Sequence, residues 1–155
     1  MGHHHHHHSH MDELLNRLRQ TWHSTIPVSE FMQIAPLSFT DGELSVSAPL
    51  APNINLHHTM FAGSIYTIMT LTGWGMVWLQ QQLLNVDGDI VLADAHIRYL
   101  APVTSAPEVK VRWPDTNLSP LQRGRKAKVK LEVQLFCDGK LCAQFDGLYV
   151  SVPKM

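Results

Sequence analysis

The sequence predicts an α+β fold in which one face of an antiparallel sheet wraps a long central helix. No Asp, Glu, Lys or Arg occurs between Glu43 and Asp87, and residues 60–84 of this gap could form a helix of roughly 37 Å. Strand-like alternation and turn signals then continue from Val91 to Val152. An uncharged helix needs cover on nearly all sides, so we expect the sheet on one side and a partner subunit on another.

Length and composition indicate one domain. The first ten of the 155 residues are an expression tag, which holds seven of the eleven histidines, so the histidine count does not indicate a metal and we expect none. Residues 11–155 fit a single domain, and 45% apolar residues suffice for a real core. A net charge of −1 gives no general attraction to nucleic acid or to a membrane, and we expect neither partner.

The start of the natural chain and the cysteines predict a cytoplasmic protein. The residues after the tag are polar and helical, unlike a signal peptide. The two cysteines, Cys137 and Cys142, form no CxxC motif and have no second pair with which to bind zinc. Both are therefore interpreted as reduced thiols of the core.

The first predicted element is an amphipathic helix over residues 12–23. Its leucines and a tryptophan recur at helical spacing, Asp12 is the expected N-cap, and Pro27 ends it. Residues 28–37 are apolar and fit either a turn of helix or a lid.

A hairpin arm follows over residues 39–48. Asp41-Gly42 is a turn signal, and apolar residues alternate with polar ones beyond it. Pro49 and Pro52 end this strand and open the polar loop that leads to the central helix.

The central helix is predicted over residues 60–84, with Thr59 as its N-cap and Asn85 as a left-handed C-cap. Length and lack of charge also fit a membrane span, but its Ser, Thr and Gln residues make the segment only moderately hydrophobic. We therefore expect a helix buried in protein. Gly73 and Gly75 would weaken a free helix, and they predict close packing against the sheet or a bend.

Four strands are predicted beyond the helix, over residues 91–100, 108–113, 128–136 and 141–152. In the first of these, one face is expected to carry the odd-numbered residues from Val91 to Tyr99. In the last strand the apolar positions change phase at Gly147, so we expect a bulge there, with Leu148, Val150 and Val152 facing inward.

This order of elements resembles the hotdog fold, in which a curled antiparallel sheet wraps a long helix. Residues 55–63 are similar to the N-x-x-G-x-x-H-G-G motif of hotdog acyl-thioesterases of the phenylacetate-pathway type. Asn55 and Gly63 match that motif, whereas His58, Phe61 and Ala62 replace its first Gly, its His and its middle Gly. The relatives carry an acid seven residues after the last Gly, where this chain has Thr70.

A closer resemblance is to the thioesterase-like domain that some bacterial proteins carry behind an acetyltransferase domain. Residues 59–64 are similar to its T-x-F-G/A-G-S run, and residues 72–75 to its T-G-W-G segment. The resemblance covers roughly residues 30–152 and implies one hotdog domain over residues 11–155. It further implies hydrolysis of acyl-CoA or acyl-carrier-protein thioesters, with coenzyme A required only as part of the substrate. The resemblance also implies a homo-oligomer, a dimer or tetramer, with sites at the subunit interface.

Thioester hydrolysis needs a polarised carbonyl, a placed water and a proton acceptor. We expect the N–H of Gly63, at the positive end of the helix dipole, to donate to the oxyanion, and Asn55 to hold the carbonyl or the water. Alternatively, Asn55 is a loop or capping residue and Gly63 permits tight packing of the helix on the sheet.

The proton acceptor is the weak point of the motif. Thr70 cannot act as a base near neutral pH; it could position water, or it could bond to its own backbone. His58 or His57 could supply a base, or could be loop residues. Ser64 and Thr67, on the first turns of the helix, are candidate substrate-binding residues, with packing as the alternative role.

The densest basic run is formed by Arg123, Arg125 and Lys126. In the enzymes that the chain resembles, such a loop meets the phosphates of coenzyme A, for which the bidentate fork of arginine is suited. The alternative is a solvated loop before a strand. Asp94 and His96 lie on the polar face of their strand, where they could meet a partner's site or face solvent.

Three functions remain open from the sequence. The leading one is an acyl-thioesterase. The second is a non-catalytic module that binds an acyl group or acyl-CoA, which Thr70 at the acid position favours. A hotdog dehydratase is the third and ranks last, because that chemistry pairs a His with a helix carboxylate and residues 60–84 contain no carboxylate.

Overall fold

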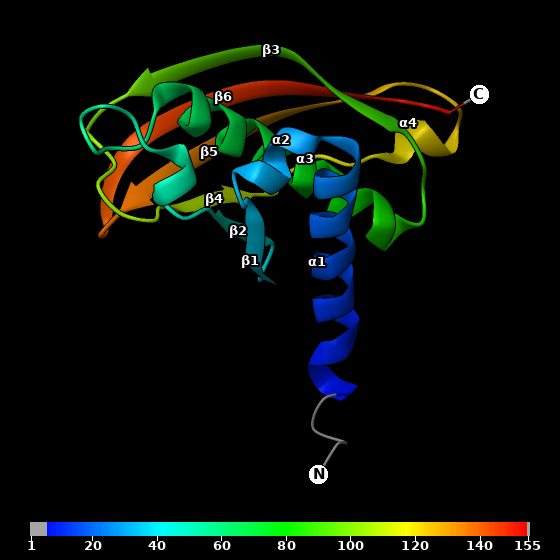
Figure 1. The fold of residues 1–155 in the computed structure, drawn as a ribbon. Coiled ribbons are helices and arrows are strands. Elements are labelled where there is room, and N and C mark those ends of the chain that lie inside the picture. The colour runs from blue at the N-terminus through cyan, green and yellow to red at the C-terminus, as the bar shows by residue number, and fades with distance from the viewer. Residues whose placement is uncertain (1–5, 155) are drawn as a thin grey trace.

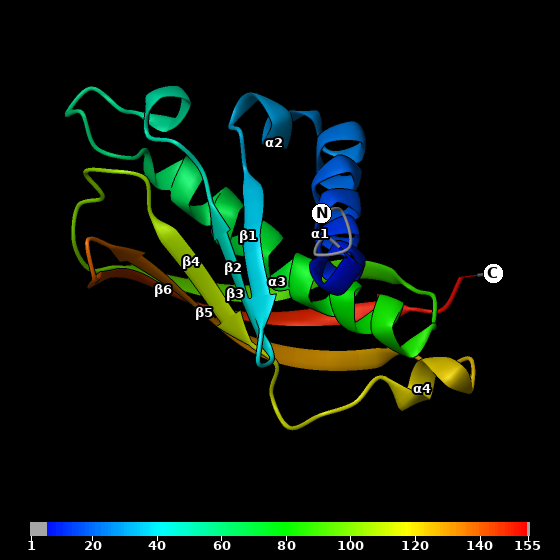
Figure 2. The same ribbon diagram turned by 90° about the horizontal axis from the view of Figure 1, so that it is seen from below.

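The computed structural model describes residues 6–154, in which six strands form one antiparallel sheet curved over a long helix (Figure 1). The elements are α1 (His6–Thr25), α2 (Pro27–Phe31), β1 (Ala35–Thr40), β2 (Glu43–Ser47), η2 (Ala51–Asn53), α3 (Ala62–Leu84), β3 (Asp89–Tyr99), β4 (Glu108–Arg112), α4 (Ser119–Gln122), β5 (Ala127–Cys137) and β6 (Lys140–Val152). The strand order is β1-β2-β4-β5-β6-β3, and α3 crosses the concave face diagonally (Figure 2). This arrangement confirms the predicted α+β hotdog architecture.

The concave face of the sheet and α3 share the main core. On β5 the inward residues Val129, Leu131, Val133 and Leu135 are all buried, as their alternation predicted. Burying an aliphatic side chain of this size stabilises the fold by roughly 1.5–3 kcal/mol. The same face continues on β6, where the rings of Phe145 and Tyr149 are buried against α3.

The helix α3 begins two residues later than predicted. Its N-cap is the extended Phe61, without a side-chain capping hydrogen bond, so the expected cap at Thr59 is wrong. Met60 is held in extended backbone instead, because it pairs with Ile54 and its N–H donates to the Val103 carbonyl over 2.8 Å. At the other end Asn85 has a φ of 54° and caps the helix in the left-handed conformation, as predicted.

Of the two mid-helix glycines, Gly73 allows close packing on the sheet, as expected, whereas Gly75 mainly allows close packing against α1. A Cβ at Gly73 would overlap the hydroxyl of Tyr149 on β6, and one at Gly75 would lie 2.8 Å from Cζ2 of Trp22 on α1. Gly73 therefore faces the sheet, whereas Gly75 faces α1.

The predicted phase change of β6 at Gly147 is wrong. The β5–β6 register runs without interruption through Gly147, and Tyr149 and Ser151 are the buried residues. Leu148, Val150 and Val152 are only half-buried, because they lie on the outer face of the sheet. Aromatic rings occupy the space that a side chain at position 147 would need, since a Cβ on Gly147 would lie 2.7 Å from the ring of Phe145.

The irregularity lies in β3 instead. Its pairing with β6 shifts between Leu92 and Asp94, so inward positions change from Ile90 and Leu92 to Ala95 and Ile97. The predicted single face of odd-numbered residues therefore holds only for the second half of the strand.

The N-terminal elements partly match the expectations. The helix α1 runs back through Asp12 to His6, so Asp12 is not an N-cap. The segment expected as a turn of helix or a lid contains α2 and then enters β1 at Ala35. No helix within residues 6–154 is long and apolar enough to cross a membrane.

Candidate functional site

The loop before α3 is organised by the side chain of Asn55. Its Oδ1 accepts hydrogen bonds from the backbone N–H groups of His57 (2.9 Å) and Thr59 (3.2 Å), and its Nδ2 donates to Thr59 Oγ1 over 3.0 Å. This geometry matches the alternative interpretation of Asn55 as a loop residue. The amide carries two donor hydrogens, so one of them is still available to a ligand.

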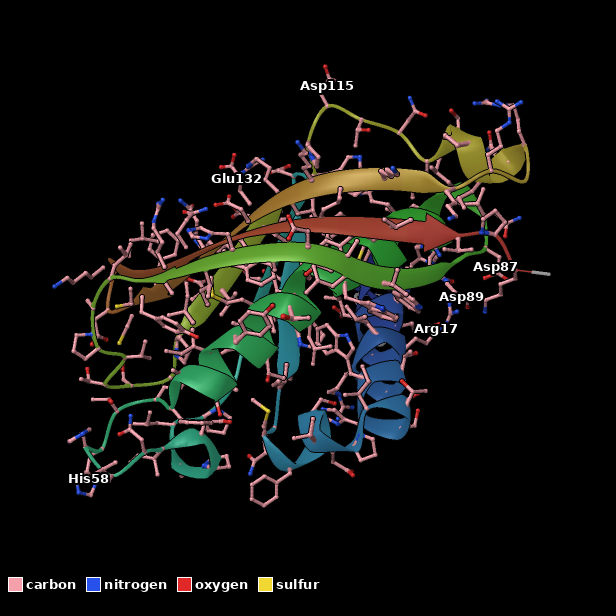
Figure 3. The ribbon with its side chains drawn as sticks, turned by 90° about the horizontal axis from the view of Figure 1, so that it is seen from above. Arg17, His58, Asp87, Asp89, Asp115 and Glu132 are labelled. Atoms are coloured by element: carbon pink, nitrogen blue, oxygen red, sulfur yellow. The ribbon has the colours of Figure 1, made fainter. Side chains whose placement is uncertain are left out.

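His58 lies at the tip of this loop. Its φ is 62°, it is exposed, and Figure 3 shows its side chain pointing outward from the loop, away from α3. His57 beside it is also exposed. A single chain therefore does not bring either imidazole to the start of α3.

The start of α3 presents backbone donors. No side chain of the described residues caps this end, and the first N–H groups, those of Ala62 and Gly63, have no carbonyl one turn earlier in the helix to bond. The half-exposed ring of Phe61 folds over Gly63, where a Cβ would overlap it. A ligand can reach the Gly63 backbone if this surface ring swings aside.

Gly63, Thr67 and Thr70 follow one another along the same side of α3, spanning roughly 10 Å. The Thr67 hydroxyl donates to the Gly63 carbonyl over 2.8 Å. The Thr70 hydroxyl is buried and has no hydrogen-bond partner among the described residues, so the alternative that it bonds its own backbone is wrong. The carbonyl of Thr70 accepts the hydroxyl of Tyr149 over 2.7 Å, which fixes this turn of α3 against β6.

A groove separates the first turns of α3 from α2, and we call it the α2–α3 groove. Its volume is about 380 Å³, within the range of small-molecule sites. The lining residues are Val28, Phe31, Met32, Pro52, Phe61, Gly63, Ser64 and Thr67. The structure thus brings three predicted site residues, Gly63, Ser64 and Thr67, to one surface.

The predicted basic run lies elsewhere. Arg123, Arg125 and Lys126 follow α4, whose Leu121 packs near Gly88 beyond the end of α3. Figures 1 and 2 place α4 at the opposite end of the molecule from the start of α3. One chain therefore does not join this run to Gly63.

Two other predicted candidates lie on the far side of the sheet. Asp94 and His96 pair with Leu148 and Asp146 of β6 on its outer face, where Figure 3 also shows Glu132. Among residues 10–154, whose side chains the structure describes, no three His, Cys, Asp or Glu side chains are grouped to hold a metal ion.

Sequence reasoning missed two residues that position the start of α3. The buried Asn53 donates from Nδ2 to the backbone carbonyls of Met32 (3.0 Å) and Pro49 (2.9 Å). The backbone carbonyl of Asn53 accepts a hydrogen bond from the Phe61 N–H over 2.7 Å. Asn53 thereby joins the end of α2 to the start of α3. Only the proline-bounded loop, with its asparagines, hinted at this role.

Tyr99, at the end of β3, is the second missed residue. Its hydroxyl donates to the Ala62 carbonyl over 3.1 Å. Partial burial and the nearby Tyr66 raise its pKa above the ordinary value, so it stays a neutral donor near pH 7. No motif marked it, because it reads as the last residue of an alternating strand.

A curled sheet around a long helix, with a glycine and free N–H groups at the helix start beside a groove, defines a hotdog protein of the thioesterase class. The chain belongs to the YiiD_C family, described as "Putative thioesterase (yiiD_Cterm)", whose model matches residues 15–153. A protein from Shewanella oneidensis named as a putative thioesterase is 95% identical, and its crystal structure covers 92% of this chain and 100% of its own at a TM-score of 0.86.

More distant structures share the fold. A Chlorobaculum tepidum protein of unknown function is 29% identical, with 93% of this chain and 97% of the other covered at a TM-score of 0.85. The phenylacetic acid degradation protein PaaI from Thermus thermophilus is 19% identical, with 81% and 98% covered at a TM-score of 0.62. At that identity the likeness shows the fold alone.

Proposed function

We propose that this protein hydrolyses acyl-CoA thioesters at the start of α3. The observation that carries the proposal is the pair of free N–H groups, of Ala62 and Gly63, beside an uncharged groove in a chain of a thioesterase family. The thioester carbonyl oxygen accepts from the Gly63 N–H. As water attacks the carbonyl carbon, charge develops on that oxygen and the donor strengthens; losing one such donor costs about 10²–10³ in rate.

The buried Thr70 hydroxyl, which has no partner among the residues that the structure describes, supports a role in holding the attacking water. A buried hydroxyl without a partner costs about 1–3 kcal/mol, which a bound water relieves. When the C–S bond breaks, the products are the carboxylic acid and the thiol of coenzyme A, which takes up the remaining proton.

The proton acceptor comes from outside α3, which has no carboxylate or imidazole between Ala62 and Leu84. His58 points away from its own helix, and its exposed position on a loop tip would allow it to serve a neighbouring subunit. We therefore assign His58 a role only across an interface.

An antiparallel pairing of two β3 strands would supply that neighbour. In the described chain β3 is an 11-residue strand at the edge of the sheet, with Val91 and Tyr99 exposed towards its two ends and Leu100 exposed just beyond it. Long unpaired edges with apolar side chains favour pairing with another chain.

Both cysteines are free and buried, which supports the expected cytoplasmic location.

The same pairing explains the distant basic run. Ile90 pairs with Ser151, and Ser151 with Ala127, so the start of β5 lies two strands, or about 10 Å, from the β3 edge. In a two-fold dimer this end of one chain faces the Tyr99 end of the other. Arg123, Arg125 and Lys126 of one subunit would then meet the phosphates of a substrate bound at α3 of its neighbour.

A panel of short, medium and aromatic acyl-CoAs tests the activity, with release of free thiol as the readout. We expect turnover well above the spontaneous rate. No turnover on any member would contradict the proposal. Sedimentation of the same sample should give at least twice the mass of one chain.

The missing carboxylate favours one alternative function, a module that binds acyl-CoA without hydrolysing it. That function predicts saturable thermal stabilisation by acyl-CoA, about 2.7 kcal/mol at a hundredfold excess over Kd, while the thioester stays intact. Hydrolysis in the same sample would exclude it.

A further inference from the structure

We propose that the α2–α3 groove binds the acyl chain of the substrate, and that Phe31 and Val28 of α2 set a preference for medium-length chains. This inference rests on the thioesterase function proposed above and names the class of acyl group. It assigns a specificity role to α2, a five-residue helix outside the catalytic motif.

The groove exposes more apolar surface than a surface helix needs. Phe31 is 72% exposed, Phe61 56% and Val28 52%, and the three lie around one hollow. Grouped exposed apolar side chains mark ligand grooves or interfaces, whereas single ones need no explanation.

The absence of charge in the groove lining favours an apolar ligand. None of its eight lining residues is ionisable, so it offers nothing to the phosphates of coenzyme A. The Thr67 hydroxyl is engaged by the Gly63 carbonyl and adds no free donor. Polar donors occur at one end, where the N–H groups of Ala62 and Gly63 emerge. An apolar walled groove that ends at amide donors fits an acyl chain whose thioester carbonyl lies at those donors.

A second copy paired at β3 does not fill this groove. Tyr66 packs edge-on against Phe145 with ring centroids 5.6 Å apart, and Tyr99 bonds the Ala62 carbonyl, so these residues mark the β3 side of α3. Ser64 and Thr67 face α2 on the other side of the helix. Dimerisation through β3 leaves the groove open to substrate.

The position of α2 is fixed, while the ring of Phe31 is free to adapt. Ser29 is fully buried, and Asn53 holds the Met32 carbonyl at the end of α2. The groove volume of about 380 Å³ lies at the low end of the range for small-molecule sites, which favours a medium-length acyl chain over a long one.

The test compares kcat/KM along a series from acetyl-CoA to palmitoyl-CoA in the wild type, Phe31→Ala and Val28→Trp. We expect the wild-type value to rise about fourfold per methylene up to about ten carbons. Phe31→Ala should lower the decanoyl value at least tenfold and the acetyl value less than threefold, and Val28→Trp should shift the optimum to shorter chains. Leu37→Ala is the matched control, because Leu37 is 56% exposed and lies on β1 outside the groove.

An unchanged chain-length profile in both groove variants would overturn the inference while leaving the thioesterase function standing. If no acyl-CoA is hydrolysed, the proposed thioesterase function is wrong, and calorimetry then tests separately whether the groove binds an acyl chain. Titration with an analogue of decanoyl-CoA that has a methylene in place of sulfur should then show tight binding in the wild type and Leu37→Ala, weakened tenfold in Phe31→Ala. Equal binding by all three proteins, or no binding by any, would overturn the inference.

Discussion

Gly63→Ala and Gly73→Ala, two substitutions in the same helix, should have different effects: the first should lower activity and the second should lower stability. At Gly73 the new methyl overlaps the hydroxyl of Tyr149, whose ring is 1% exposed and tied to the Thr70 carbonyl. Overpacking costs about 1–3 kcal/mol and the lost hydrogen bond about 1 kcal/mol, offset by about 1 kcal/mol of helix propensity. We expect a net loss of about 1–3 kcal/mol, or a Tm lower by about 2–12 °C.

At Gly63 the same methyl overlaps the ring of Phe61, which is 56% exposed and can swing into solvent. The free energy of unfolding should therefore change by less than about 1 kcal/mol. The methyl and the displaced ring would obstruct the approach to the Gly63 N–H, so kcat/KM should fall about 10²–10³-fold.

Thermal unfolding followed by circular dichroism, and thiol release from decanoyl-CoA, measure both effects on the same samples. Wild-type activity in Gly63→Ala would refute the oxyanion role. A Tm for Gly73→Ala equal to that of Gly63→Ala would refute the packing argument.

Three further predictions concern the hydroxyl of Thr70, the phenol of Tyr149 and the basic run. Thr70→Val should leave the stability to urea unchanged or raise it, because the lost hydroxyl has no partner within residues 10–154, but should lower kcat about tenfold or more; unchanged turnover would remove Thr70 from the mechanism. Burial raises the pKa of Tyr149 far above that of the unfolded chain, so its contribution to stability is complete below pH about 10 and is lost as the pH rises further. Above pH about 10, the free energy of unfolding of Tyr149→Phe should therefore fall less steeply with pH than that of the wild type, by up to about 1.4 kcal/mol per pH unit. Parallel curves of unfolding free energy against pH for the two proteins would contradict this. Replacing Arg123, Arg125 and Lys126 by Ala should raise KM for acyl-CoA about tenfold but not for the matching acyl-pantetheine, and an equal effect on both substrates would exclude phosphate binding.

The sheet and the central helix could be predicted because their signals are local. Inward residues alternate along β5, and Asn85 caps α3 as its sequence context indicates. The faces of β6 could not be predicted in this way. Tyr149 turns inward because α3 offers it the Thr70 carbonyl, a contact between residues 79 positions apart.

The candidate site was predicted in part for the same reason. Gly63 follows from the motif, whereas the start of α3 depends on pairing of the preceding segment with Ile54 and Val103. The groove depends on where Asn53 places α2, which no local pattern encodes. Contributions from a second subunit leave only indirect marks in one chain, such as an exposed edge strand and a basic run far from the helix start.

Binding of a thioester carbonyl at the start of α3 is the central claim, and amide NMR tests it most directly. Uniformly ¹⁵N-labelled protein would be titrated with the analogue of decanoyl-CoA in which a methylene replaces the sulfur and the carbonyl is retained. We expect saturable downfield shifts of the Ala62 and Gly63 amides, because a new acceptor meets those N–H groups. Saturable binding that leaves both amides unshifted would contradict it.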